Sequence, residues 1–336
     1  MLVDGGIGAR LDRVPAEAKR GEERGYDAVW GAETTIDPFL ALVLAAEHTE
    51  RVQLGTSITV AFARSPMTLA TTAWNLQAYS KGRLLLGLGS QIKAHIEKRF
   101  SMPWSHPAPR MREFISAMRA IWDSWQNGTK LDFRGDFYTH TLMTPFFNPG
   151  PIESGPPKVF LAAVGEGMTR VAAEVADGML VHGFSTEQYL REVTLPQIEA
   201  GLAASGRSRQ QFQLSYPIFV VTGGNDQEMQ AAAEGTRKQI AFYGSTPAYR
   251  GVLEVHGWGD LQPELNQLSK RGEWDAMAKL IDDDVLDAFA VVAPPDQVAA
   301  GIKARVGDVV DRIHLYTPYA ADRDRADDIL AALKAA

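Results

Sequence analysis

The chain has 336 residues, of which 45% are hydrophobic and 22% are charged, as in an ordinary globular protein. Its formal net charge is −7 and no basic stripe stands out, so nucleic acid is not an expected partner, because phosphate binding needs clustered Lys and Arg. It contains no cysteine, which excludes disulfides, thiolate zinc sites and cysteine nucleophiles. Its seven histidines show no metal-binding spacing, so no metal is expected either.

The N-terminus "MLVDGGIGARLDR" lacks the basic segment and following apolar run of an export signal. No apolar run approaches the ~18 residues that a membrane-spanning helix needs. We therefore expect a cytoplasmic protein with no membrane association. The match to a glycosylation acceptor at Asn127-Gly128-Thr129 then predicts a turn rather than a glycan site.

Short apolar runs alternate with helical patterns through the first 125 residues. Strands are predicted at 1–7, 26–33, 52–61 and 83–89. Helices are predicted after them, at 12–24, 37–48, 65–80 and 110–125. Two of these helices open with a capping residue followed by proline, at Asp37-Pro38 and Ser65-Pro66, which is a favourable order for a helix start.

Residues 126–157 interrupt the alternation, since they are rich in Gly, Pro and aromatic residues. The stretch "LDFRGDFYTH" inside them indicates a β-hairpin, and we expect a long loop over one end of the fold, of the kind that serves as a lid or binding element. A second insertion is expected at about 244–311. It reads as mainly helical, with Pro294-Pro295 as a break between helices.

Between and after the insertions the alternation resumes. Strands are predicted at 158–165, 178–184, 212–224 and 312–318. The chain then has eight strands, nearly all separated by helices, and alternating βα units imply a parallel sheet. We predict one domain over 1–336 that folds as a (β/α)8 barrel with insertions after its fourth and seventh strands. A doubly wound sheet is the alternative, because its strands are also buried on both faces.

The fourth predicted strand ends in Gly87-Leu88-Gly89 and is followed by Ser90 and Gln91. A dinucleotide fingerprint would need a third glycine, but position 92 is isoleucine. In a barrel these glycines would lie at the mouth, where a missing side chain lets a flat ring approach the backbone. Ser90 and Gln91 would then present hydrogen-bonding groups to that mouth. A plain turn followed by a solvated helix is the other interpretation.

A second glycine pair, Gly165-Glu166-Gly167, joins the fifth strand to a helix. Backbone N–H groups at a helix N-terminus attract anions, and glycines allow a phosphate to come close. A tight turn explains the pattern equally well, and Glu166 fits a phosphate site only if its side chain turns away.

Polar residues also follow the second and third strands. Thr56, Ser57 and Thr59 are strand-end residues that precede a helix. Glu33 follows the second strand directly and can serve as a proton donor or acceptor, although a solvated loop carboxylate is the simpler interpretation.

Several stretches, in chain order, resemble those of the luciferase-like flavin and deazaflavin oxidoreductases. They are "AETTIDPF", "LGTSITVAFARSPMTLA", "GRLLLGLGSQIKAHIEKRF", "MPWSHPAPRMREF" and "AAVGEGMTRVAAEVADG". The resemblance covers nearly the whole chain. The stretch "GLGSQIKAHIEKRF" is the most specific and is similar to the branch assigned to coenzyme F-420, a 5-deazaflavin hydride carrier.

The resemblance implies a TIM barrel with the cofactor ring in its mouth, a non-proline cis peptide at Ser57-Ile58, and Glu33 where relatives often have a catalytic His. It also implies a small-molecule substrate and a homodimer. Arg64, Lys93 and Arg99 are candidates to contact the polyglutamyl tail of the carrier. The residues implied at the cofactor are Ser57, Ile58, Thr59, Ser90, Gln91, Val164, Gly165, Glu166, Gly167 and Met168, the last five around its phosphate.

Three alternatives stay open. The first is a two-component monooxygenase that uses FMN and oxygen in place of coenzyme F-420. The second is a protein that binds the deazaflavin without turnover. The third, a non-redox barrel lyase, is disfavoured because no lysine or metal site is seen at a strand end.

Overall fold

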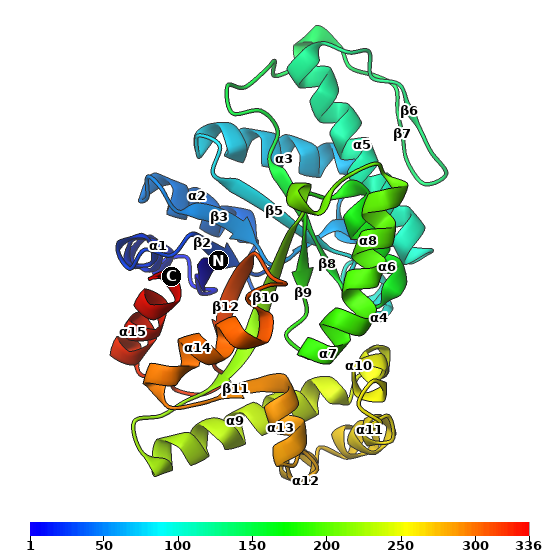
Figure 1. The fold of residues 1–336 in the computed structure, drawn as a ribbon. Helices are drawn as coiled ribbons and strands as arrows, with labels where there is room; N and C mark the ends of the chain where they lie inside the picture. The colour runs from blue at the N-terminus through cyan, green and yellow to red at the C-terminus, as the bar shows by residue number, and fades with distance from the viewer. Residues whose placement is uncertain (336) are drawn as a thin grey trace.

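The computed structural model describes residues 1–335 and contains eight parallel strands that close into a barrel (Figure 1). The strands are β1 (Leu2–Gly6), β2 (Ala28–Gly31), β3 (Gln53–Thr56), β5 (Leu84–Gly89), β8 (Lys158–Ala163), β9 (Gly178–Val181), β10 (Gln213–Val221) and β12 (Arg312–Tyr316). Each pairs with the next, β9 pairs with β10, and β12 pairs back with β1. The predicted (β/α)8 barrel is confirmed. The doubly wound alternative is wrong, because an open sheet would leave two unpaired edges.

Helices surround the barrel and connect its strands (Figure 1). The longer ones are α1 (Val14–Glu23), α2 (Pro38–Glu47), α3 (Pro66–Tyr79), α5 (Pro107–Asn127), α6 (Glu166–Val175), α8 (Leu195–Ala204), α9 (Asp226–Gly244), α14 (Pro295–Val306) and α15 (Arg323–Lys334). The predicted caps are present, since the side chains of Asp37 and Ser65 accept hydrogen bonds from first-turn amides of α2 and α3.

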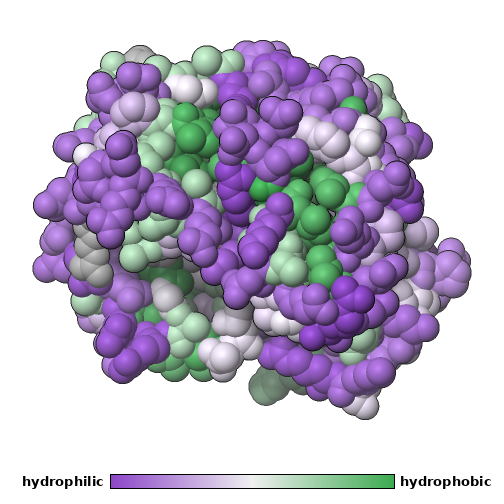
Figure 2. Space-filling model, turned by 90° about the horizontal axis from the view of Figure 1, so that it is seen from below, coloured by the Kyte–Doolittle hydropathy of each residue, from purple (hydrophilic) through white to green (hydrophobic). Residues whose placement is uncertain are grey.

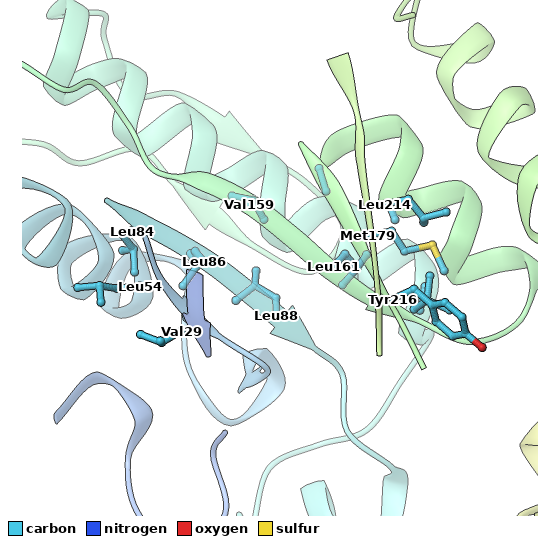
Figure 3. Packing of buried hydrophobic residues seen from close by; sticks show 14 of the residues in the cluster. Val29, Leu54, Leu84, Leu86, Leu88, Val159, Leu161, Met179, Leu214 and Tyr216 are labelled. Atoms are coloured by element: carbon cyan, nitrogen blue, oxygen red, sulfur yellow. The ribbon is translucent and has the colours of Figure 1, made fainter. Parts of the chain in front are cut away.

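The strands bury their side chains in two layers. Outward residues such as Val29, Leu86 and Leu161 belong to the large core between sheet and helices (Figure 3). Inward residues, among them Trp30 and Phe160, fill the barrel. Apolar residues on both faces explain why these strands read as continuous apolar runs rather than as alternating ones.

The first insertion contains the expected hairpin, formed by β6 (Phe133–Arg134) and β7 (Thr139–His140). The carboxylate of Glu113, in the N-terminal half of α5, accepts hydrogen bonds from the amides of Asp136 and Phe137 at 2.9 and 2.8 Å. The hairpin therefore folds back along α5.

The second insertion contains the helices α10 (Arg250–Glu254), α11 (Leu261–Arg271), α12 (Trp274–Lys279) and α13 (Asp283–Phe289). It also contains a strand that the sequence analysis missed, β11 (Ala290–Val292), which pairs in parallel with the end of β10. The predicted break at Pro294-Pro295 therefore separates a strand from a helix rather than two helices.

A buried ion pair joins the first barrel strand to the last. Arg312 donates from Nε and Nη2 to the two carboxylate oxygens of Asp4, each at 2.8 Å, and the two side chains are 1% and 0% exposed. The indole of Trp30 on β2 donates a third hydrogen bond to Asp4, at 2.9 Å. The bidentate geometry satisfies both charges inside the barrel, where an unpaired charge would be very costly.

We expect Asp4→Asn to lower the free energy of unfolding by about 3–5 kcal/mol, because it leaves the guanidinium of Arg312 buried without a countercharge. Urea unfolding followed by circular dichroism measures this. Asp12→Asn, which breaks an exposed pair with Arg10, is the control and should change stability little. A loss below about 1 kcal/mol for Asp4→Asn would show that the pair does not hold the barrel closed.

Candidate active site

The carboxyl ends of the strands surround a cavity of about 220 Å³. Its walls include Ile7, Trp30, Ser57, Leu180, Pro217 and His314, from six different strands or the loops that follow them. Three helices mark the carboxyl end of the barrel, since each lies between a barrel strand and the next strand in the chain: α4 (Lys93–Lys98), α7 (Glu187–Tyr189) and α10. They lie in the lower part of Figure 1, so Figure 2, which is seen from below, faces the carboxyl ends of the strands. Apolar residues gather there in recesses between hydrophilic ones (Figure 2).

The predicted third strand is split at this end into β3 and a short strand β4 (Thr59–Val60), with the expected cis peptide at Ser57-Ile58 between them. The backbone ladder to β5 is interrupted over these residues, and the hydroxyl of Thr56 bridges the gap. It donates to the carbonyl of Gly87 at 2.7 Å and accepts from the amide of Gly87 at 2.9 Å. Ser57 is exposed at the cavity, whereas Thr59 is fully buried.

The two glycines of β5 serve this split strand and do not leave space for a ring, which corrects the sequence-based interpretation. A Cβ atom on Gly87 would lie 1.8 Å from the carbonyl oxygen of Thr56, and one on Gly89 would lie 2.9 Å from the side chain of Ile58. The missing side chains therefore admit the neighbouring chain segment. Ser90 and Gln91 follow, both half-buried, and Gln91 accepts a hydrogen bond from the amide of Ile92 through its own side chain.

Glu33 braces the same segment. Its Oε2 accepts hydrogen bonds from the amide of Val60 at 2.8 Å and from Nη1 of Arg64 at 2.7 Å, and its side chain is only 8% exposed. Arg64 also pairs with Asp37 through Nη2, at 3.0 Å. Arg64 is thus engaged with two carboxylates, which does not favour the expectation that it contacts an anionic tail.

The N-terminus of α6 presents the features of an anion site. Gly165 precedes the helix with φ = +84°, a conformation that favours glycine, and Gly165, Glu166 and Gly167 are exposed. The first amides of any helix have no partner within the helix, so they are available to a ligand. The carboxylate of Glu166 turns onto α8, where it accepts a hydrogen bond from Gln197 at 3.2 Å.

Two histidines of the barrel, His182 and His314, were considered in the sequence only for metal spacing, and their positions in the fold were missed. His182 follows β9, and its Nδ1 accepts a hydrogen bond from the amide of Phe184 at 3.0 Å. Burial lowers the pKa of His182 to about 4, so the ring is neutral and its proton is on Nε2, which faces the hydroxyl of Tyr249 at 3.3 Å. The available signal was a His inside each of two predicted barrel strands, at 178–184 and 312–318.

Tyr249 belongs to an aromatic cluster built partly by the second insertion. Tyr243 and Tyr316 share a hydrogen bond of 2.9 Å, and the ring of Tyr316 stacks on Phe219 at 4.6 Å. The ring of His182 packs against Tyr243 and Tyr249 at 4.7 and 4.6 Å. The insertion thus adds Tyr249 to aromatic groups that lie at the ends of β9, β10 and β12.

Within residues 1–335, no group of three or more acidic or His side chains is arranged to hold a metal ion. No helix in that range is both long enough and apolar enough to cross a membrane.

The closed barrel, with its cavity and polar groups at the carboxyl ends of the strands, places the chain among the TIM barrels. Residues 2–312 match the family model described as luciferase-like monooxygenase. The chain therefore belongs to the luciferase-like monooxygenase family, and the resemblance stated from the sequence is confirmed.

Relatives extend over nearly the whole chain. The uncharacterized protein Rv1360 of Mycobacterium tuberculosis is 59% identical over 313 residues, which cover 93% of this chain and 92% of that protein. The 5,10-methylenetetrahydromethanopterin reductase of Archaeoglobus fulgidus is 27% identical over 322 residues, covering 93% and 91%. Among solved structures, the coenzyme F-420-dependent tetrahydromethanopterin reductase of Methanopyrus kandleri has a TM-score of 0.80 at 21% identity, covering 98% and 96%.

Proposed function

We propose that the protein transfers a hydride between coenzyme F-420 and a small organic substrate. The observation that carries the proposal is the likeness, over more than nine-tenths of the chain, to a methylenetetrahydromethanopterin reductase in sequence and to a coenzyme F-420-dependent reductase in fold. The proposal does not extend to the substrates of those relatives.

The residues at the mouth fit a flat heterocycle with an anionic tail. Ser57 reaches the cavity. Thr59 is proposed as a cofactor contact from the family resemblance alone, since its hydroxyl is fully buried, does not line the cavity and has no hydrogen-bond partner within residues 1–335. The amides from Gly165 to Met168 are proposed to hold the phosphate, beside Val164. Ile58, Ser90 and Gln91 are proposed to contact the ring or the chain that carries it.

When bound, the deazaflavin supplies two-electron hydride chemistry, and the protein supplies position and exclusion of water. The half-buried segment at Ile58 and the interior residue Trp30 are proposed to fix the plane of the ring and of the substrate. The braced loop at Glu33 keeps that segment in place through the amide of Val60.

FMN with oxygen is the second candidate, and the description of the family as monooxygenases favours it. The two cofactors differ at position 5, where deazaflavin has carbon and FMN has nitrogen. The third candidate is a protein that binds the deazaflavin without catalysing a reaction. Such a protein would retain the anion site, but none of its properties would require the carboxylate of Glu33 as a proton donor.

Fluorescence titration of the purified protein with coenzyme F-420 and with FMN tests the cofactor. We expect micromolar or tighter binding of the deazaflavin and at least tenfold weaker binding of FMN. Gly167→Asp should weaken deazaflavin binding at least tenfold, because it adds a negative charge at the anion site, while an acidic residue in a first helical turn does not harm the helix.

Gln227→Asp adds the same charge to the exposed first turn of α9 and serves as the matched control. The affinity of Gln227→Asp for the deazaflavin should equal that of the original protein. Tight binding of FMN alone would replace the deazaflavin by FMN in the proposal.

Glu33 is proposed to take part in catalysis, as the sequence predicts. Glu33→Gln keeps an acceptor for Val60 but removes the charge that faces Arg64, and we expect turnover to fall at least tenfold, or by 10²–10⁴ if the carboxyl transfers a proton. Single-turnover absorbance of the bound carrier measures the rate. Asp37→Asn removes only the second partner of Arg64 and should retain activity, whereas full activity of Glu33→Gln would remove Glu33 from the mechanism.

We also propose a homodimer through α2 and α3. Leu40 and Val43 lie on one face of α2 and are 56% and 44% exposed, and Tyr79 at the end of α3 is hydrogen-bonded to Glu47 on that face. Sedimentation equilibrium should give a molecular mass of twice the 36.7 kDa of one chain. Leu40→Asp should lower this mass toward that of the monomer. A monomeric original protein would contradict this proposal.

A further inference from the structure

The cavity at the barrel mouth contains one imidazole whose proton position is set by the backbone. His314 lies on β12 opposite Asp4 of β1, and its Nδ1 is 3.1 Å from the carbonyl oxygen of Asp4. A carbonyl oxygen can only accept, so Nδ1 must carry the proton of this hydrogen bond. In the neutral ring, Nε2 then has a free lone pair.

The surroundings keep the ring neutral. Burial lowers the pKa of His314, and the negative charge of Asp4 opposes this only in part. That charge is already matched by the bidentate contact with Arg312. A neutral imidazole with Nδ1–H is a hydrogen-bond acceptor on its other side.

Nε2 has no protein partner in the described range 1–335, although the ring is half-buried. His314 is part of the cavity wall together with Ser57 and Trp30, and the edge of the ring lies beside Gly6, which has no side chain to cover it. His182 differs, since both of its nitrogens are bonded within the protein. Nε2 is accessible rather than fully buried, so a ligand in this cavity can donate a hydrogen bond to an acceptor that no protein group in this range uses.

We propose that Nε2 of His314 is the hydrogen-bond acceptor for the substrate, so that this cavity selects molecules that carry a hydroxyl or N–H group. The inference rests on the proposed function and adds one assignment to it: the substrate occupies this cavity, and the cofactor ring covers it at Ser57. The proposal narrows the range of substrates. A substrate carbonyl oxygen beside Nε2 would be unfavourable, because both atoms are hydrogen-bond acceptors and neither carries a proton. The alcohol or amine form of the redox pair is therefore the form that the free site recognises.

Nitrogen-15 NMR of histidine-labelled protein tests the proton position without any cofactor. The resonances that disappear in His314→Gln should show the Nδ1–H form, and those that disappear in His182→Gln should show the Nε2–H form. A charged ring or the Nε2–H form for His314 at neutral pH would overturn the proposal.

Binding of two probes of equal size tests the selection. Cyclohexanol can donate a hydrogen bond and should shift the Nε2 resonance of His314 and bind about tenfold more tightly than cyclohexanone, which can only accept; tenfold corresponds to about 1.4 kcal/mol. His314→Phe keeps a flat ring and should lose the preference. His314→Gln should restore it, because its amide can donate to Asp4 while its oxygen accepts from the probe.

His48→Gln, at the exposed residue that follows α2, is the matched control and should bind both probes as the original protein does. Equal binding of the two probes to the original protein, or an unchanged preference in His314→Phe, would end the proposal. Failure of the deazaflavin titration with these results intact would reject the proposed cofactor alone. Deazaflavin binding without a probe preference would reject the role of His314 alone.

Discussion

The contact between Asp4 and Arg312 joins residues 308 positions apart and holds the two ends of the sheet together. The other strand pairs form between segments that are closer in the chain, whereas this one must close a ring. The carboxylate of Asp4 also accepts a hydrogen bond from the indole of Trp30, and its carbonyl oxygen accepts one from the imidazole of His314. One residue therefore links β1, β2 and β12 and orients two walls of the cavity. Closure of the barrel and shape of the site depend on the same side chain.

The barrel could be predicted because its signal is distributed over the whole chain. Each strand is buried on both faces and each is followed by a helix, so eight apolar runs remain visible even where one boundary is misplaced. The strand β11 could not be predicted in this way. Its three residues lie between two helices, and they form a strand only because β10 extends beyond β9 and offers an unpaired edge.

The candidate site could be predicted in part. The helix start at Gly165 and the polar groups at Ser57 and Ser90 follow from their places at strand ends, which a barrel brings together. The partners of Glu33 could not be predicted, because Arg64 is 31 residues away in sequence and meets it only through the split third strand. The glycines of β5 were misinterpreted for a similar reason. Only the structure shows that Thr56 and Ile58 occupy the space beside them.

The pairing of β11 with β10 has a mechanical consequence for the second insertion. Residues 290–292 are hydrogen-bonded into the sheet, and α13 and α14 are joined directly to that strand. The C-terminal part of this insertion is therefore fixed to the barrel. To swing outward, this part of the insertion would have to break backbone pairs of the central sheet.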